Sequence, residues 1–232
     1  MKTVAIIQAR FGSKRLPGKV LMDMAGQPML GRVIDKVLQT HALHDIIVAT
    51  STQPENDAIC DYVESLGIKA FQGSEQDVLS RYYRCARFYA VDHIVRITGD
   101  CPLLDPVLLD NVIKQHLLVG ADYTSNIFPK RTYPRGLDIE IFTFRTLERM
   151  WMRASGGYGR EHVTPYIHKH PELFLIHSVT NPKDYSRLQW SVDTSKDFDF
   201  AERVYKHFHL TSKFSWEDVL LYEEEGKWKQ LN

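Results

Sequence analysis

The fold is decided by the stretch TVAIIQARFGSKRLPGK, residues 3–19, in which an apolar run leads directly into a basic loop. The run at residues 3–7 is apolar and rich in β-branched side chains, which predicts a strand buried on both faces of a sheet. The loop is close to the phosphate-binding P-loop, GxxxxGK[ST], but does not match it. It contains two glycines and four cations, which are Arg10, Lys14, Arg15 and Lys19.

The departures from the P-loop exclude a nucleotide hydrolase of that type. Gly12 and Gly18 are separated by one residue too many, and Val20 stands where the magnesium-binding hydroxyl belongs. Pro17 also removes a backbone donor. Four cations in so short a loop repel one another unless an anion or carboxylates offset them, and Arg and Lys both hold phosphate oxygens strongly. A bound polyphosphate is the interpretation we favour, and a solvated basic loop is the alternative.

Strands and helices alternate from the start of the chain to residue 125. Apolar runs predict the strands, and apolar residues at helical spacing predict helices between them. The expected strands are residues 3–7, 45–50, 68–71, 93–98 and 122–125, and the expected helices are 28–38, 55–66, 75–90 and 105–119. Such alternation predicts an α/β fold, a mostly parallel twisted sheet flanked by helices. In such sheets ligands bind at the carboxyl ends of the strands.

The second half of the chain is less regular. Residues 137–142 alternate apolar and acidic side chains, which predicts a half-exposed strand. We expect a mobile loop at SGGYG, residues 155–159. The remaining expected elements are strands at 173–179 and 188–192 and helices at 159–170, 195–209 and 215–225.

The composition is that of an ordinary globular protein. The chain has 232 residues, 44% hydrophobic and 25% charged, which suits one large domain or one domain with a small appendage. Lys plus Arg equal Asp plus Glu at 29 each, so the net charge predicts neither a nucleic acid nor an anionic membrane as partner. No apolar run approaches the roughly 20 residues that cross a bilayer. The three cysteines form no CxxC pair, and cytoplasmic residence is the default expectation.

Two aspartates follow predicted strands. Asp100, in RITGDCPLLD, comes two residues after one strand, and Asp193, in WSVDTSKD, ends another. Carboxylates beside a polyphosphate repel it unless a cation lies between them, and Mg²⁺ held by one or two carboxylates plus phosphate oxygens is the usual arrangement. The alternative for Asp100 is that it closes a turn. Thr194 and Asp197 are typical of a capping box for the next helix.

Two further polar groups are candidates for binding a substrate. The two-residue period of PRGLDIE puts Asp138 and Glu140 on one face of a strand, where paired carboxylates either bind amines and hydroxyls or simply face water. Glu161 and His162 follow the glycines of residues 155–159. They belong either to a substrate lid or to the start of a helix.

Three motifs in this order resemble one known family. IIQARFGSKRLPGKVL, RITGDCPLLD and WSVDTSKDF are similar to motifs of the cytidylyltransferases that activate acidic sugars, such as the synthetases of CMP-sialic acid and CMP-3-deoxy-manno-octulosonate. DVLSRYY, PRGLDIEIF and REHVTPY resemble the spore coat polysaccharide branch. The resemblance covers residues 4–204. It implies a nucleotide-diphospho-sugar transferase (Rossmann-like) fold, one domain over residues 1–232, and a homodimer whose small β-containing arm lies in residues 127–185.

The resemblance also implies a reaction and its residues. The reaction is transfer of CMP from CTP to an acidic sugar or related acceptor, with release of pyrophosphate, in surface polysaccharide biosynthesis. Catalysis is assigned to Arg10, Arg15, Lys19 and Asp100, and Mg²⁺ to Asp100 and Asp193. Nucleotide binding, with backbone groups reading cytosine, is assigned to Ala9, Arg10, Gly12, Ser13, Arg15, Lys19, Gly73, Ser74, Asp77, Val78, Arg81 and Thr98. The acceptor is assigned to Asp138, Glu140, Glu161 and His162.

Three other functions stay open. A glycosyltransferase of similar architecture would need an Asp-x-Asp metal motif after a strand, which Asp138 and Glu140 only imitate. The other two are a nucleotidyltransferase that uses another nucleoside triphosphate and a nucleotide-sugar binding protein without catalysis. Sialate-type sugar motifs are not evident, so the acceptor stays unidentified.

Overall fold

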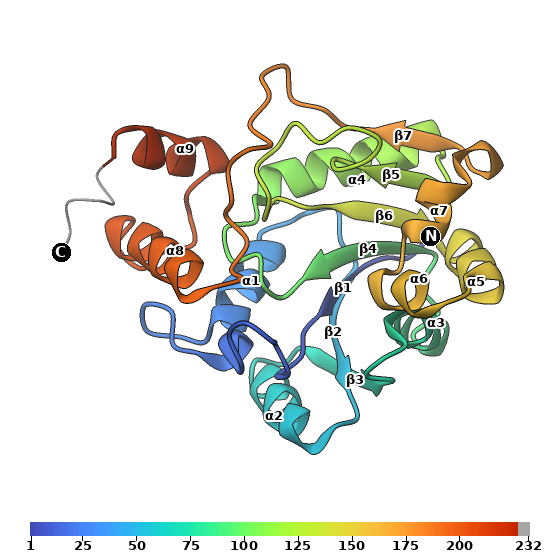
Figure 1. Ribbon diagram of the computed structural model, residues 1–232, viewed down its shortest axis with the longest axis horizontal. Helices are drawn as coiled ribbons and strands as arrows, with labels where there is room; N and C mark the ends of the chain where they lie inside the picture. The colour runs from blue at the N-terminus through green and yellow to red at the C-terminus, as the bar shows by residue number, and fades with distance from the viewer. Residues whose placement is uncertain (227–232) are drawn as a thin grey trace.

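Seven strands form one sheet in residues 1–226, the part of the chain that the computed structural model describes (Figure 1). The strands are β1 (Thr3–Gln8), β2 (Asp45–Ser51), β3 (Lys69–Gly73), β4 (His93–Thr98), β5 (Tyr123–Ser125), β6 (Glu140–Thr143) and β7 (Ile176–Ser178). Their order across the sheet is β3-β2-β1-β4-β6-β5-β7. Only β6 is antiparallel to its neighbours, so β5 runs in the same direction as β1–β4.

Helices cover both faces of the sheet. The helices are α1 (Met29–Leu38), α2 (Asp57–Ser65), α3 (Val78–Phe88), α4 (Pro106–Val119), α5 (Phe144–Arg153), α6 (Gly157–His162), α7 (Pro165–Lys169), α8 (Ser195–His207) and α9 (Trp216–Glu224), with 3-10 turns η1 (Lys19–Leu21), η2 (Pro54–Asn56) and η3 (Pro171–Leu173). One apolar core lies between the sheet and α1, α2, α4, α8 and α9. A second core lies between the other face and α3, α5 and α7. None of the described helices is long and apolar enough to span a membrane.

The alternation predicted for the first half is confirmed, and side-chain caps help to explain where the helices begin. Asp77, Asp105 and Thr194 each accept a hydrogen bond from a backbone N–H in the first turn of α3, α4 and α8. The predicted capping box of Thr194 and Asp197 is present. Because β1 and β4 are parallel neighbours, Gln8 and Thr98 end side by side at one edge of the sheet. The expected domain of residues 1–232 includes residues 227–232, which lie outside the described part.

The strand predicted at residues 137–142 forms in part, but the prediction that it is half-exposed was wrong. Only β6 forms there, between β4 and β5, and Glu140 is 1% exposed. Its carboxylate forms an ion pair with Arg96 of β4, which is why a charge is tolerated in the sheet interior. The helix α5 that follows was not predicted. Thr143 caps it by accepting a hydrogen bond from the N–H of Thr146.

The predicted helix at 159–170 is interrupted. It forms α6 and α7, separated at Val163, whose φ of 71° is outside the helical region. Gly157 and Gly159, expected in a loop, belong to α6. The strand expected at 173–179 is shortened to β7, because the 3-10 turn η3 precedes it.

The segment at residues 188–192 is not one of the seven strands, yet its backbone pairs on two sides. The N–H of Trp190 donates to the carbonyl oxygen of Arg135 at 2.7 Å, and the N–H of Val192 donates to that of Asp100 at 2.8 Å. Gly136 has φ 105°, and a Cβ there would lie 2.5 Å from the backbone nitrogen of Ser191, so only glycine fits this crossing. The pairing brings Asp193 beside the end of β4.

Candidate active site

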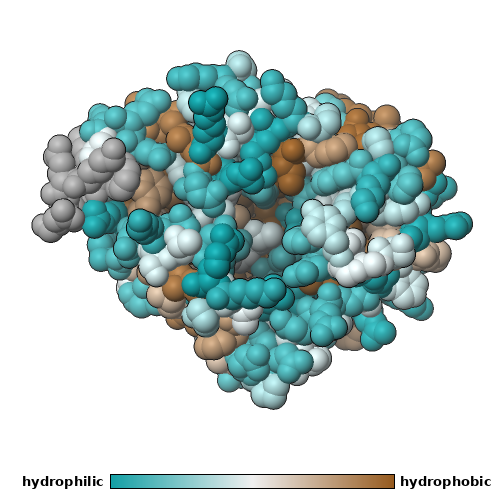
Figure 2. Space-filling model, in the orientation of Figure 1, coloured by the Kyte–Doolittle hydropathy of each residue, from teal (hydrophilic) through white to brown (hydrophobic). Residues whose placement is uncertain are grey.

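A cavity of about 380 Å³ opens at the carboxyl ends of β1 and β4. Figure 2 shows the hollow near the middle of the face on view, surrounded by hydrophilic side chains. Its lining comes from the basic loop, from α3, from the ends of the two strands, from α6 and from the segment that follows residue 188. The lining residues are Gln8, Ala9, Arg10, Ser13, Lys14, Arg15, Lys19, Val20, Val78, Arg81, Thr98, Gly99, Asp100, Glu161, His162 and Asp193.

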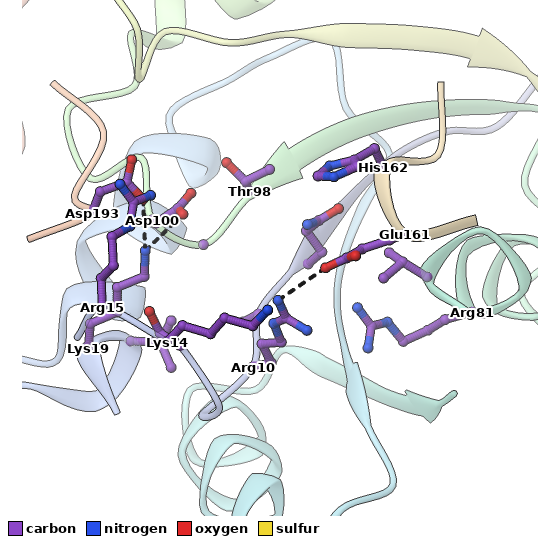
Figure 3. A pocket seen from close by; sticks show the side chains of 16 residues that line it. Arg10, Lys14, Arg15, Lys19, Arg81, Thr98, Asp100, Glu161, His162 and Asp193 are labelled. Atoms are coloured by element: carbon purple, nitrogen blue, oxygen red, sulfur yellow. Dashed lines mark hydrogen bonds and ion pairs between the residues drawn. The ribbon is translucent and has the colours of Figure 1, made fainter. Parts of the chain in front are cut away.

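Lys19 lies between the two aspartates predicted to bind metal. Its Nζ is 3.0 Å from Oδ2 of Asp100 and 3.8 Å from Oδ1 of Asp193 (Figure 3). The residue is only 6% exposed, because the 3-10 turn η1 directs it inward after Gly18, which has φ 70°. Lys19 therefore places one positive charge beside two carboxylates that come from distant parts of the chain.

Asp100 is held in its ionised form. Burial alone would raise the pKa of its carboxyl group, but the charge of Lys19 and hydrogen bonds from Lys19 and Thr98 lower the pKa below its ordinary value. Asp193 is paired with Arg15, whose Nη2 is 2.7 Å from Oδ1. Both carboxylates thus face cations of the basic loop.

These two carboxylates fit a magnesium site that a ligand completes. Carboxylate oxygens are the donors that Mg²⁺ prefers, and it usually takes only one or two from the protein, with phosphate oxygens and water for the rest. Among the described residues no group of three His, Cys, Asp or Glu side chains is placed to hold a metal. Asp100 and Asp193 would therefore hold Mg²⁺ together with a bound phosphate.

Arg10 connects the basic loop to α6, which lines the cavity, and to the segment that precedes α3. Its Nη1 is 3.3 Å from Glu75 and its Nη2 is 3.5 Å from Glu161 of α6. The side chain of Asn56 accepts a hydrogen bond from the N–H of Phe11 at 2.8 Å, which anchors the loop. Figure 3 shows Lys14 reaching across the cavity toward Arg10.

Several residues predicted to bind the nucleotide support the cavity instead of lining it. Ser74 accepts a hydrogen bond from Arg81 through its carbonyl oxygen at 3.2 Å. Asp77 caps α3 and also accepts hydrogen bonds from Arg160 at 2.6 and 2.8 Å. Gly73 lies beneath Arg81, and Gly12 also lies outside the lining. The other predicted nucleotide residues, Ala9, Arg10, Ser13, Arg15, Lys19, Val78, Arg81 and Thr98, line the cavity.

The four residues predicted to face the acceptor divide into two pairs. Glu161 and His162 line the cavity from α6. Asp138 does not, and it forms a two-pronged ion pair with Arg131. Glu140 is buried in the sheet between Arg96 and the hydroxyl of Tyr123. The structure therefore does not bring Asp138 and Glu140 to the cavity. The pair, which resembles an Asp-x-Asp motif only weakly, also does not lie beside the basic loop.

Four lining residues were given no role in the site from the sequence: Gln8, Lys14, Val20 and Gly99. The side-chain oxygen of Gln8 is buried and has no hydrogen-bond partner among the described residues. A polar residue directly after the apolar run of the first strand was the available signal for it. Lys14 was counted among the loop cations but given no role.

Comparison with known proteins shows the family to which the chain is similar. A family model described as cytidylyltransferase matches residues 4–232. The spore coat polysaccharide biosynthesis protein SpsF of Bacillus subtilis is 32% identical over 208 residues, which are 87% of this chain and 85% of its own. A 3-deoxy-manno-octulosonate cytidylyltransferase of Trichlorobacter lovleyi is 36% identical over 119 residues, which are 50% of this chain and 46% of its own.

A solved structure shows that the similarity extends through the whole fold. A cytidylyltransferase from Leptospira borgpetersenii has a TM-score of 0.94 and 32% identity, and the match covers 100% of this chain and 98% of that one. The family resemblance and the fold class expected from the sequence are thus confirmed. The chain belongs to the cytidylyltransferase family of nucleotidyltransferases.

Proposed function

We propose that the chain transfers CMP from CTP to a hydroxyl group of an acidic sugar or related acceptor and releases pyrophosphate, in surface polysaccharide biosynthesis. The observation that carries the proposal is Lys19, placed between Asp100 and Asp193 in a cavity that Arg10 and Arg15 also line. Loop cations suit a triphosphate, and the two carboxylates suit the metal that accompanies it. The Trichlorobacter relative, a 3-deoxy-manno-octulosonate cytidylyltransferase, supports an acidic sugar as acceptor, and the Bacillus relative supports a role in polysaccharide biosynthesis.

The chemistry follows from these groups. The acceptor oxygen forms a bond to the α-phosphorus, the bond from that phosphorus to the bridging oxygen of the β-phosphate breaks, and pyrophosphate leaves with the electron pair. The hydroxyl proton passes to solvent. Negative charge is redistributed over phosphate oxygens, so catalysis is mainly positioning and electrostatic stabilisation. In this proposal Arg10, Arg15 and Lys19, which line the cavity, provide this stabilisation.

In this proposal Asp100 and Asp193 hold Mg²⁺. The bound ion supplies positive charge beside the phosphates and lowers the pKa of a hydroxyl group next to it. Lys19 and Arg15 hold the two carboxylates in place by ion pairs before the nucleotide binds. Once the nucleotide binds, the N–H groups of Lys19 and Arg15 lie in the same cavity as its phosphates.

The acceptor side and the assembly are also part of the proposal. Glu161 and His162 face the acceptor. Asp138 and Glu140 contribute to acceptor binding only indirectly, because they form ion pairs with Arg131 and Arg96 respectively. We also propose that the protein acts in the cytoplasm as a homodimer of single-domain subunits, with residues 127–185 as the acceptor and dimer region.

A screen for pyrophosphate release tests the reaction. Four nucleoside triphosphates are each combined with a panel of acidic and neutral sugars in the presence of Mg²⁺. Release is expected only with CTP and an acidic acceptor, and it should stop when Mg²⁺ is chelated. Turnover of a UDP-sugar without pyrophosphate would instead support a glycosyltransferase. Tight CTP binding without turnover across the panel would support a binding protein.

A further inference from the structure

Among residues 1–226, the buried cation Arg81 has no carboxylate partner. The residue lies on α3 and is 2% exposed. In the described part of the chain its side chain donates one hydrogen bond, from Nη1 to the carbonyl oxygen of Ser74 at 3.2 Å, and its Nε has no partner. A guanidinium group has five N–H donors, and burying them unpaired is costly. The remaining donors therefore call for a ligand.

The position of Arg81 identifies the part of the ligand that it meets. Figure 3 shows its guanidinium pointing from α3 toward Arg10, across the cavity from Lys19 and the two aspartates. The basic loop therefore supplies the cations for a triphosphate at the end of the cavity that contains Lys19. Val78, one turn earlier on α3, adds an apolar surface beside Arg81. A flat ring with acceptor atoms on its edge suits this end of the cavity.

The side chain of Arg81 is held in one place by packing. A Cβ on Gly73 would lie 2.9 Å from Cγ of Arg81, so the absence of a side chain at Gly73 leaves the room that Arg81 occupies. Glu75, whose charge acts to raise the pKa of Arg81, pairs with Arg10 at 3.3 Å. Burial lowers the pKa of Arg81, because its charge is not fully balanced within the protein. A preorganised donor of this kind is suited to selecting a ligand.

We infer that Arg81 is a specificity-determining residue that reads the nucleotide base by donating hydrogen bonds to O2 and N3 of cytosine. This inference rests on the proposed use of CTP and replaces the backbone readout expected from the sequence with a side-chain readout. Cytosine presents two adjacent acceptors at these atoms. Uracil carries a proton on N3, so a donor would face a donor, and Arg81 disfavours UTP.

The test separates the base from the phosphates by using each as a probe. Binding of cytidine, inorganic tripolyphosphate, CTP and UTP is measured by calorimetry for the wild type, Arg81→Gln and Arg81→Lys. Arg84→Gln is the matched control, because Arg84 is exposed on the same helix. For Arg81→Gln we expect cytidine and CTP affinity to fall about tenfold or more, the preference for CTP over UTP to shrink by a similar factor, and tripolyphosphate binding to be unchanged.

The conservative variant and the control sharpen the outcome. Arg81→Lys keeps the charge but not the paired donors, so it should remain impaired toward cytidine. Arg84→Gln should match the wild type with every probe. Equal weakening of CTP and UTP in Arg81→Gln, or weaker tripolyphosphate binding, would overturn the inference and assign Arg81 to the phosphates.

A measurement on the unmodified protein covers the case in which the Arg81 variants fail to fold. The wild type should bind 3-deazacytidine, which has a C–H in place of N3, about tenfold more weakly than cytidine. Equal binding of the two would contradict the readout of N3 while leaving the proposed cytidylyltransferase reaction intact. A wild type that binds no CTP would overturn both the reaction and the inference.

Discussion

At the level of the residue, the backbone of Asp100 and its side chain have different roles, and a substitution can separate them. Its carbonyl oxygen accepts a hydrogen bond from the N–H of Val192 at 2.8 Å, and a side-chain substitution leaves that bond in place. Asp100→Asn should therefore keep the fold while removing the charge proposed to hold Mg²⁺. We expect the rate of pyrophosphate release to fall roughly 100-fold, with little change in melting temperature.

The control for this prediction is Asp61→Asn, at an exposed position on α2. It should leave both the rate and the melting temperature unchanged. An Asp100→Asn enzyme with the wild-type rate would remove Asp100 from the proposed mechanism.

Lys19 provides a second prediction, which concerns pH. Its charge and hydrogen bond lower the pKa of Asp100, so Lys19→Met should let that pKa rise. The carboxylate then becomes protonated at a higher pH, and the acidic limb of the pH–rate profile should move upward. Affinity for tripolyphosphate should also fall, by about tenfold, because a charged donor to phosphate is lost.

Lys14→Met is the matched control for Lys19→Met. Lys14 is exposed, and no carboxylate partner is seen for it among the described residues. The acidic limb should stay in place in this variant. If Lys19→Met and wild type had superimposable profiles, Lys19 would not be the group that sets the pKa of Asp100.

At the level of the element, α6 is the wall of the cavity with the weakest attachment. No residue of this helix is buried in the described structure. Arg160 holds it to Asp77 by two hydrogen bonds and to the carbonyl oxygen of Trp151 at 2.9 Å, and Glu161 reaches Arg10 at 3.5 Å. Polar contacts thus provide most of what holds α6 in place.

Arg160→Ala should therefore loosen α6 without unfolding the protein. We expect amide hydrogen exchange at residues 157–162 to accelerate by about tenfold, with the global melting temperature nearly unchanged. The KM for the acceptor should rise, because Glu161 and His162 move with the helix. Arg153→Ala, at an exposed position on α5, is the control. Unchanged exchange in Arg160→Ala would mean that other contacts hold α6.

At the level of the whole molecule, the segment before α9 is joined to α1 through buried cations. Arg32 donates to the carbonyl oxygen of Leu210 at 2.9 Å, and Lys36 donates to that of Phe214 at 2.7 Å. Lys36 is 1% exposed. Burial lowers its pKa from 10.5 to about 7, although Asp105 and Asp218 act in the opposite direction. The second half of the chain is thus connected to the first by a titratable contact.

The pH dependence of unfolding should reveal Lys36. Between about pH 7 and pH 10 the unfolded chain binds a proton at Lys36 that the folded protein does not, so this group makes stability rise with pH. Relative to Lys36→Met, wild-type stability should increase by roughly 1 kcal/mol per pH unit in urea titrations over this interval. Lys114→Met, exposed on α4, should parallel the wild type. Parallel curves for Lys36→Met would show that Lys36 stays charged when buried.

The sequence predicts the first half of the fold well because local signals mark its elements. Apolar runs mark β1–β4, and the caps at Asp77 and Asp105 mark the starts of α3 and α4. Glu140 was misread because its alternation with apolar neighbours is typical of a solvent-facing residue. Its partner Arg96 is 44 residues away, and single-sequence patterns do not show such pairs. The helix α5 left a readable signal, the cap at Thr143, that was missed.

The candidate site also has a part that local sequence signals predict and a part that they do not. The loop cations and Asp100 follow strands whose ends the alternation places at one edge, so their meeting in one cavity is predictable. The ion pairs of Arg10 with Glu75 and Glu161 join three separate segments and depend on packing that no local pattern reports. The same holds for the burial of Arg81 over Gly73.

Gly136 sets a limit on how this scaffold can be re-engineered. Its backbone lies against Ser191 while Arg135 pairs with Trp190, so the loop that precedes β6 and the segment that ends at Asp193 are built as one piece. Exchanging residues 127–135 for the loop of a relative, in order to change acceptor preference, would also reposition Asp193 unless this crossing is retained. A transplanted loop should therefore end in glycine at position 136, so that a new acceptor pocket is obtained without displacing the proposed metal-binding aspartate.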